Sequence, residues 1–513
     1  MQYKSLRLYA CLMLLFTGFS DGVYAQLTTT VSTESGMVSG HKEGYVTIFK
    51  GIPFAAPPVG ELRWKAPQPV KNWSGVLKCD SFSASPMQNK PVPFMMWSRE
   101  FITPPDKLSE DCLYLNIWTP ARSNKDKMPV FVWIYGGGFT SGSAACDVYD
   151  GDAMARNGIV FVSFNYRVGV FGFLAHPELS AESPDKVSGN YGLLDQVAAL
   201  KWIRKNITAF GGDPDKVTIA GQSAGSMSVG ALVVSPLTKG LFRGAIMESG
   251  GIAGSRFVRK LADAEMSGAA FMKKLNAANI AELRKISAEE LVAESGSAPG
   301  GFGPNADGYM IPTDIMANIR KGDFNQVDMI AGWVSGDASL MGVQKITPDQ
   351  YLAQVKEKYG DKSDEFLKYY PGRTDSEVNV SLKELNLMQF AALPAQLMAV
   401  YNKHNTYLYE FSHVPADKPG FPNYGAFHTS EVPFALRNLH KWDRPWRPVD
   451  YSVELTLSEF WCNFTRTGNP NGIRLPEWQP YIRTTGIIME MGDEFIGEAL
   501  MNVKFQFLDS LEK

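Results

Sequence analysis

The sequence contains little of what marks several specialised protein classes. It has only five cysteines and six histidines in 513 residues, with no Cys-x-x-Cys or Cys/His cluster. A disulfide scaffold and a structural zinc site are therefore excluded. The net charge of −3 arises from 50 basic and 53 acidic residues, which leaves no electrostatic footprint for nucleic acid or for anionic membranes. Apolar residues make up 45% of the chain, which is ample for a folded core and excludes disorder as the main state.

The N-terminus carries the pattern of an export signal. Lys4 and Arg7 precede an apolar stretch over residues 8–19, and a polar turn then leads to Ala25. A basic region, a short apolar region and a small residue for cleavage predict a signal peptide over residues 1–25. The alternative is a buried N-terminal helix. No later stretch has the length of a membrane span, so we expect residues 26–513 to form a single exported domain, secreted or periplasmic.

Short apolar runs alternate with helical patterns along the chain. Residues 191–210 repeat apolar side chains at helical spacing. The runs themselves are apolar nearly throughout, as in strands of a parallel sheet that are buried on both faces. This alternation predicts an α/β fold with a central, mostly parallel sheet flanked by helices. The expected strands are residues 130–135, 159–165, 217–220, 244–247, 327–331 and 406–411.

A Gly-x-Ser-x-Gly motif follows the third of these runs. Ser223 stands between Gly221 and Gly225, where an apolar strand gives way to a helix. In that context the motif predicts a nucleophile elbow, a tight turn that exposes the serine hydroxyl at the helix N-terminus. The alternative is a Gly/Ser turn without chemistry.

A second glycine-rich turn follows the run at 130–135. Its glycines, Gly136 to Gly138, let backbone N–H groups approach a developing oxyanion, as in the loop of lipases and esterases. The predicted oxyanion donors are Gly137, Gly138 and Ala224. A phosphate-binding loop is the competing interpretation, but no Gly-Lys-Ser/Thr follows.

These motifs and several others together resemble the type B carboxylesterase/lipase family, the cholinesterase-like α/β-hydrolases. The resemblance extends from about residue 33 to residue 483. It implies an α/β-hydrolase fold, a serine carboxylesterase activity and no requirement for a cofactor or metal. The matching segments are residues 49–64, 110–116, 165–168, 190–196, 210–214 and 221–225.

The catalytic base must follow the acid, which follows Ser223 in this fold. Position along the chain leaves His413 and His428 ahead of His404 and His440. The resemblance selects His428, because residues 425–428 with Glu431 downstream look like the family's histidine motif.

The acid is expected just beyond the strand at 327–331. The family usually carries Glu in this loop, and the matching position here is Asp337. Asp is shorter by about 1.5 Å, so we expect the loop to lie closer to His428. Asp328 is the alternative, but it lies at the start of the strand. The resulting prediction is a Ser223–His428–Asp337 triad that hydrolyses a small-molecule ester through an acyl-enzyme.

Several further positions depart from the family or carry hypotheses. Gln222 replaces a frequent Glu, which disfavours cationic substrates unless either residue merely satisfies the same hydrogen bonds. Ser249 resembles a position that supports the acid, or is a buried structural serine. The resemblance implies a Cys79–Cys112 disulfide with a shifted loop. Residues 91–105 either line the pocket mouth or form a self-packed surface loop. Residues 300–304 are expected to leave an open acyl pocket.

Overall fold

The computed structural model describes residues 28–254, 257–296, 300–341, 345–499 and 502–511. The predicted signal peptide, residues 1–25, lies outside the described residues, so export of residues 26–513 stays a prediction. Among the described residues, no helix is both long and apolar enough to cross a bilayer.

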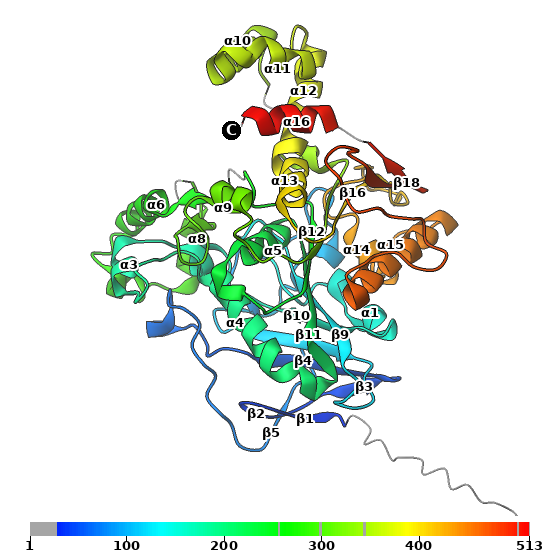
Figure 1. Ribbon diagram of the computed structural model, residues 1–513. Coiled ribbons are helices and arrows are strands. Elements are labelled where there is room, and N and C mark those ends of the chain that lie inside the picture. The colour runs from blue at the N-terminus through cyan, green and yellow to red at the C-terminus, as the bar shows by residue number, and fades with distance from the viewer. Residues whose placement is uncertain (1–27, 255–256, 297–299, 342–344, 500–501, 512–513) are drawn as a thin grey trace, which may run out of the picture.

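An eleven-stranded mixed sheet forms the centre of the molecule, with helices on both sides (Figure 1). Six neighbouring pairings, from β10 to β17, are parallel, and the pairings at the two ends are antiparallel. In spatial order the strands are β18 (Phe495–Glu498), β17 (Ile488–Met491), β16 (Thr406–Phe411), β15 (Asp328–Val334), β12 (Gly244–Glu248), β11 (Gly212–Gln222), β9 (Met128–Ile134), β10 (Val160–Phe164), β8 (Tyr114–Thr119), β4 (Val46–Pro53) and β3 (His41–Glu43).

The predicted α/β fold is confirmed, and all six predicted runs are neighbours in this sheet. They are β9, β10, β11, β12, β15 and β16, and their side chains are almost entirely buried on both faces. The antiparallel strands β4 and β8 were not predicted. Both are also mostly buried, because they continue the same core rather than form a solvated edge.

Sixteen α-helices lie among the described residues, and short strands make three small sheets. The predicted helix at 191–210 is α4 followed by a 3-10 turn, which ends where Gly211 adopts a φ of 81°. The small sheets contain β1 (Thr30–Thr33), β2 (Gly36–Ser39) and β5 (Val76–Lys78); β6 (Ser85–Pro86) and β7 (Leu108–Ser109); and β13 (Arg259–Lys260) and β14 (Asn305–Ala306). The helices are α1 (Asp152–Arg156), α2 (Gly169–Phe173), α3 (Pro177–Glu182), α4 (Tyr191–Asn206), α5 (Ala224–Val234), α6 (Leu261–Lys274), α7 (Ile280–Leu283), α8 (Ala288–Ser295), α9 (Ile315–Lys321), α10 (Pro348–Tyr359), α11 (Ser363–Tyr369), α12 (Asp375–Leu387), α13 (Leu393–Tyr401), α14 (Val432–Ala435), α15 (Pro448–Thr467) and α16 (Asn502–Leu511).

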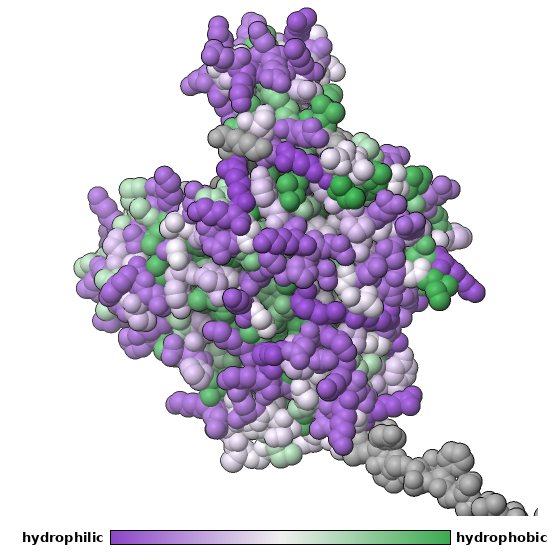
Figure 2. Space-filling view, in the orientation of Figure 1, coloured by the Kyte–Doolittle hydropathy of each residue, from purple (hydrophilic) through white to green (hydrophobic). Residues whose placement is uncertain are grey.

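Helices α10 to α12 and α16 project from one end of the molecule (Figure 1). Aromatic contacts hold them together, since the Phe366 ring lies 6.2 Å from that of Phe507 on α16. Lys504 of α16 also forms an ion pair with Glu384 of α12. The face drawn in Figure 2 is mainly hydrophilic, and its apolar patches are small and scattered, several of them near the base of this projection.

The predicted Cys79–Cys112 disulfide is not present, because both residues are buried free thiols. The two side chains have different surroundings. The Cys79 thiol lies 3.9 Å from the Gly51 carbonyl oxygen. Burial and the charge of Asp195 raise the pKa of Cys112 well above its usual value, whereas the Arg167 guanidinium lowers it. The chain segments that pack on these thiols, not their spacing in sequence, determine where they point.

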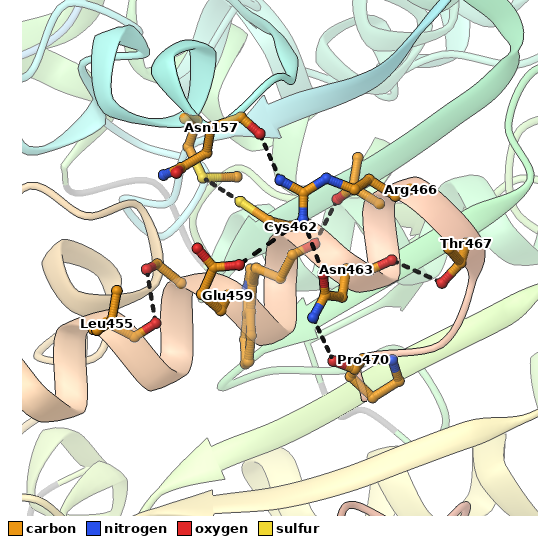
Figure 3. Close-up of polar contacts among 12 residues, drawn as sticks. Asn157, Leu455, Glu459, Cys462, Asn463, Arg466, Thr467 and Pro470 are labelled. Carbon is orange, nitrogen blue, oxygen red and sulfur yellow. Dashed lines mark hydrogen bonds and ion pairs between the residues drawn. The ribbon is translucent and has the colours of Figure 1, made fainter. Parts of the chain in front are cut away.

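Cys146 and Cys462 are also free and buried. Figure 3 shows Cys462 on α15, where its thiol lies 3.7 Å from the Met154 sulfur. One turn further along, the Arg466 guanidinium donates to the carbonyl oxygen of Asn157 at 2.5 Å and to Asn463 Oδ1 at 2.9 Å. The contacts with Met154 and Asn157 fasten α15 to α1 and to the residue that follows it.

Candidate active site

Ser223 occupies a strained turn between β11 and α5. Its φ of 59° and ψ of −124° are unusual for a residue with a side chain. The turn is held by its N–H, which donates to the Glu248 carbonyl oxygen at 2.8 Å. A Cβ on Gly221 or on Gly225 would lie closer than 3.0 Å to the Ile134 carbonyl oxygen. Both glycines are therefore required for α5 to begin directly against the end of β9.

The glycine loop after β9 lies beside this turn. Gly137 and Gly138 adopt φ values of 116° and 62°, which residues with a side chain rarely adopt. The N–H groups of Thr140 and Ser141 both donate to the Gly137 carbonyl oxygen at 3.1 Å. Ala224 is the first residue of α5, where a backbone N–H has no partner within the helix. The structure thus places all three predicted donor residues around the Ser223 turn.

Gln88 fastens the far end of the glycine loop, a contact that sequence reasoning missed. Its buried side-chain amide makes two hydrogen bonds with the backbone of Gly142. The Gly142 N–H donates to Gln88 Oε1 at 3.0 Å, and Gln88 Nε2 donates to the Gly142 carbonyl oxygen at 2.9 Å. This two-point clamp restricts the position of the loop.

Asp337 and His428 meet beyond the end of β15. His428 Nδ1 lies 2.5 Å from Asp337 Oδ1, and both side chains are buried. The other carboxylate oxygen accepts from the Val334 N–H at 2.9 Å. Because a carboxylate oxygen only accepts, Nδ1 carries the hydrogen, and Nε2 is left as the basic nitrogen of the ring.

The two loops that carry this pair pack backbone to backbone. A Cβ on Gly336 would overlap the carbonyl oxygen of Ala426, two residues before His428. Glycine at position 336 is what permits this close packing. Whether the loop lies closer than it would with the longer Glu side chain stays a prediction.

The side-chain amide of Gln222, not the hydroxyl of Ser223, makes a polar contact with the imidazole ring of His428. Gln222 Nε2 lies 3.2 Å from His428 Nε2, and the amide oxygen has no partner. Among the described residues, no hydrogen bond joins Ser223 to His428. Catalytic hydrogen bonds are often long in unliganded enzymes and tighten when substrate binds.

Two buried glutamates lie behind His428 and Asp337. Burial raises the pKa of Glu248 to about 8, although Trp461 Nε1 donates to it at 2.8 Å. Burial, together with the charges of Glu248 and Asp337, raises the pKa of Glu431 well above its usual value. Ser249 donates to Glu431 at 3.1 Å rather than to Asp337. Ser249 therefore supports the neighbouring carboxyl group and is itself buried.

The other histidines are occupied elsewhere. His413 is buried between two carboxylates, with Nε2 2.8 Å from Asp450 and Nδ1 2.6 Å from Asp493. His404 lies near Asp328 at the opposite end of β15, at 3.7 Å. Neither pair lines the cavity that holds Ser223.

A cavity of about 500 Å³ opens onto Ser223 and His428. Residues between 91 and 103 line it, which confirms that this segment borders the pocket. The segment also packs on its own aromatics, because the rings of Phe94 and Trp97 lie 4.7 Å apart. Trp97 fixes this segment, because its Nε1 donates to Thr429 Oγ1 at 2.6 Å and its ring lies edge-on to that of His428. The expectation for residues 300–304 is wrong. Phe302 is buried against Phe271 instead, and the segment does not line this cavity.

No group of three or more His, Cys, Asp or Glu residues that could hold a metal ion occurs in the described parts of the chain. The features in place are instead those of a hydrolase. A strand–turn–helix serine, a glycine loop and a buried His–Asp pair lie at the carboxyl ends of parallel strands. Together with the mixed sheet they define an α/β-hydrolase.

Comparison with known proteins identifies the family. Residues 27–508 match the model of the carboxylesterase family. The chain is 38% identical to fumonisin B1 esterase of Sphingopyxis macrogoltabida, over 90% of this chain and 86% of that protein. It is 35% identical to para-nitrobenzyl esterase of Bacillus subtilis, over 89% and 94%. The structure resembles a Geobacillus stearothermophilus carboxylesterase with a TM-score of 0.80 and 32% identity, covering 93% of this chain and 99% of the other. The chain belongs to the carboxylesterase family and is a carboxylic ester hydrolase.

Proposed function

We propose that the protein hydrolyses small carboxylic esters through Ser223, His428 and Asp337, with a covalent acyl-enzyme intermediate. The observation that carries this proposal is the buried His428–Asp337 pair beside the strained Ser223 turn, at one cavity. A lone Gly-x-Ser-x-Gly turn would not need an oriented imidazole next to it.

In the first step Ser223 Oγ attacks the ester carbonyl carbon and His428 Nε2 takes the hydroxyl proton. The carbonyl oxygen becomes an oxyanion that the N–H groups of Gly137, Gly138 and Ala224 stabilise. His428 then gives the proton to the departing alkoxide, which leaves as an alcohol. Asp337 keeps the imidazole in the required tautomer and stabilises its cationic form.

In the second step water attacks the acyl-enzyme, again with His428 as base. The carbonyl–Ser223 bond breaks, the serine recovers its proton and a carboxylic acid is released. Gln222 Nε2 lies 3.2 Å from His428 Nε2 and 3.4 Å from Nδ1, so it stands over the imidazole ring. The in-plane lone pair of Nε2 is therefore free to accept the serine proton.

The test is hydrolysis of 4-nitrophenyl esters from acetyl to octanoyl by wild type and Ser223→Ala. The exposed Ser452 of α15 offers a matched control, Ser452→Ala. We expect Ser223→Ala to lose roughly 10³-fold or more in kcat and the control to lose nothing. Equal rates for wild type and Ser223→Ala would overturn the proposed nucleophile. Inactivity of the folded wild type on every ester would favour a binding protein on the same fold.

A further inference from the structure

We propose that the site prefers esters that carry a negatively charged group as well as an apolar body, and that Lys90 is the residue that sets this preference. The inference rests on the proposed function, because it concerns the substrate of that same cavity. It begins with the charges of the cavity wall. Among the described residues that line the cavity, Lys90 is the one lysine or arginine, and none is Asp or Glu.

The remaining ionisable groups of the wall add no negative charge near neutral pH. Burial raises the pKa of Cys146 to about 12 and that of Tyr149 well above its usual value. Behind the wall, Glu248 and Glu431 hold their protons for the same reason. The Asp337 carboxylate is the exception, and it is bonded to His428.

The residue at position 222 also affects the charge of the cavity wall. A carboxylate there would lie beside His428 and the nucleophile, where it would attract cationic substrates. The side chain is instead the neutral amide of Gln222, which lines the cavity and contacts His428. A quaternary ammonium ester therefore meets no negative partner on this wall.

Two carboxylates that lie near the cavity in sequence already have partners within the protein. Asp147 pairs with Arg99 at 3.4 Å, and Glu100 accepts a hydrogen bond from the Ser98 hydroxyl at 2.5 Å. Neither lines the cavity. Among the described residues that line the cavity, Lys90 is therefore the one side chain that carries a permanent charge.

Lys90 itself is exposed and makes no ion pair or hydrogen bond with any residue that the structure describes. Its backbone is held near the glycine loop, because the Gln88 side chain, two residues earlier, makes two hydrogen bonds with Gly142. Pro91 follows directly and restricts the backbone of Lys90 to extended conformations. The four-carbon stem can then carry the ammonium group to an acidic group of a substrate whose ester lies at Ser223.

The rest of the wall determines the apolar part of the substrate. The cavity that Lys90 lines is also lined by four apolar side chains from the segment that follows it, Val92, Phe94, Trp97 and Phe101. Phe94 and Val92 remain more than half exposed. A ring or alkyl chain can cover these residues while a carboxylate reaches the ammonium group. The substrate class is therefore an amphipathic acidic ester, with the acid on either the acyl or the alcohol part.

The test measures kcat/KM for matched pairs of esters in wild type, Lys90→Met and Lys90→Glu. For the acyl part, the mono-4-nitrophenyl ester of glutaric acid is compared with 4-nitrophenyl pentanoate. For the alcohol part, 3-acetoxybenzoate is compared with 3-methylphenyl acetate. The pair that responds identifies which part carries the acid. The control is Lys239→Met, because Lys239 is exposed and precedes the amino-terminal end of β12, whereas Ser223 follows the carboxyl end of the neighbouring parallel strand β11.

We expect Lys90→Met to lower the acidic-to-neutral ratio roughly two- to fivefold, as for one exposed ion pair, and Lys90→Glu to lower it further. The neutral esters and Lys239→Met should show no change. Raising the salt concentration to 1 M, where the Debye length is about 3 Å, should bring the wild-type ratio toward that of Lys90→Met. Unchanged ratios in both Lys90 variants, with neutral esters still hydrolysed, would overturn the inference alone. Failure to hydrolyse any ester would instead overturn the proposed function.

Discussion

Substitution of Gly336 by alanine should disable the site without touching any of the groups proposed to react. Gly336 precedes Asp337, and its Cα faces the backbone that leads into His428. An added Cβ would lie closer than 3.0 Å to the Ala426 carbonyl oxygen, a separation that real Cβ atoms essentially never show. The atoms that this Cβ would meet belong to the backbone of Ala426 and Phe427, so no flexible side chain can move aside. The two loops must separate.

The expected loss follows from the size of that movement. A shift of roughly 1 Å would lengthen the 2.5 Å contact between Asp337 and His428 to the limit of a hydrogen bond. Misplacement by this amount costs about 10²-fold in rate, and complete loss of the orienting carboxylate costs about 10⁴-fold. Gly336→Ala should therefore reduce kcat between these limits and leave KM for a small ester nearly unchanged.

The assay is steady-state hydrolysis of 4-nitrophenyl acetate, with thermal unfolding recorded on the same samples. Gly303→Ala is the matched control, because a Cβ there meets no atom within 4 Å and the residue does not adopt a positive φ. A folded Gly336→Ala with the same kcat as Gly303→Ala would refute the argument. It would show that the loop spacing does not position the His428–Asp337 pair.

Three further predictions concern the same region. Asp337→Asn should fold normally but lose about 10³- to 10⁴-fold in kcat, measured with 4-nitrophenyl esters, because the amide no longer fixes the tautomer of His428; retained activity would exclude Asp337 as the acid. Gln222→Glu should move the acid limb of the kcat/KM profile to higher pH by about one unit, since a carboxylate would then favour the protonated imidazole; an unmoved limb would contradict the contact between the two side chains. Glu248→Gln should flatten the pH dependence of stability. The folded state keeps the Glu248 proton up to about pH 8, whereas the unfolded chain releases it near 4.5, so between pH 5 and pH 7 wild type loses about 2–3 kcal/mol more unfolding free energy than Glu248→Gln. Urea unfolding of both proteins at these two pH values checks this, and parallel losses would refute it.

Local patterns in the sequence determined the strands and the position of the serine. Apolar runs such as 217–220 are buried on both faces, so their composition alone indicates a parallel sheet. The Gly221–Gly225 motif is equally local, because only glycine fits where α5 meets the Ile134 carbonyl oxygen. The identity of the catalytic histidine was less well determined by the sequence. Position along the chain left both His413 and His428 open, and only the family resemblance selected His428.

Contacts between distant segments were decided only by the tertiary structure. Trp97 meets Thr429 across 332 residues, Gln222 meets His428 across 206, and Asp337 meets His428 across 91. No periodicity or motif records which side chains such packing brings together. The same reason explains why the Cys79–Cys112 bond that the family resemblance implied is absent and two free thiols are found. A residue's type and spacing define which bonds it could make. The burial and direction that the whole fold imposes decide which of those bonds it does make, and this protein's charge-poor cavity is a product of that same packing.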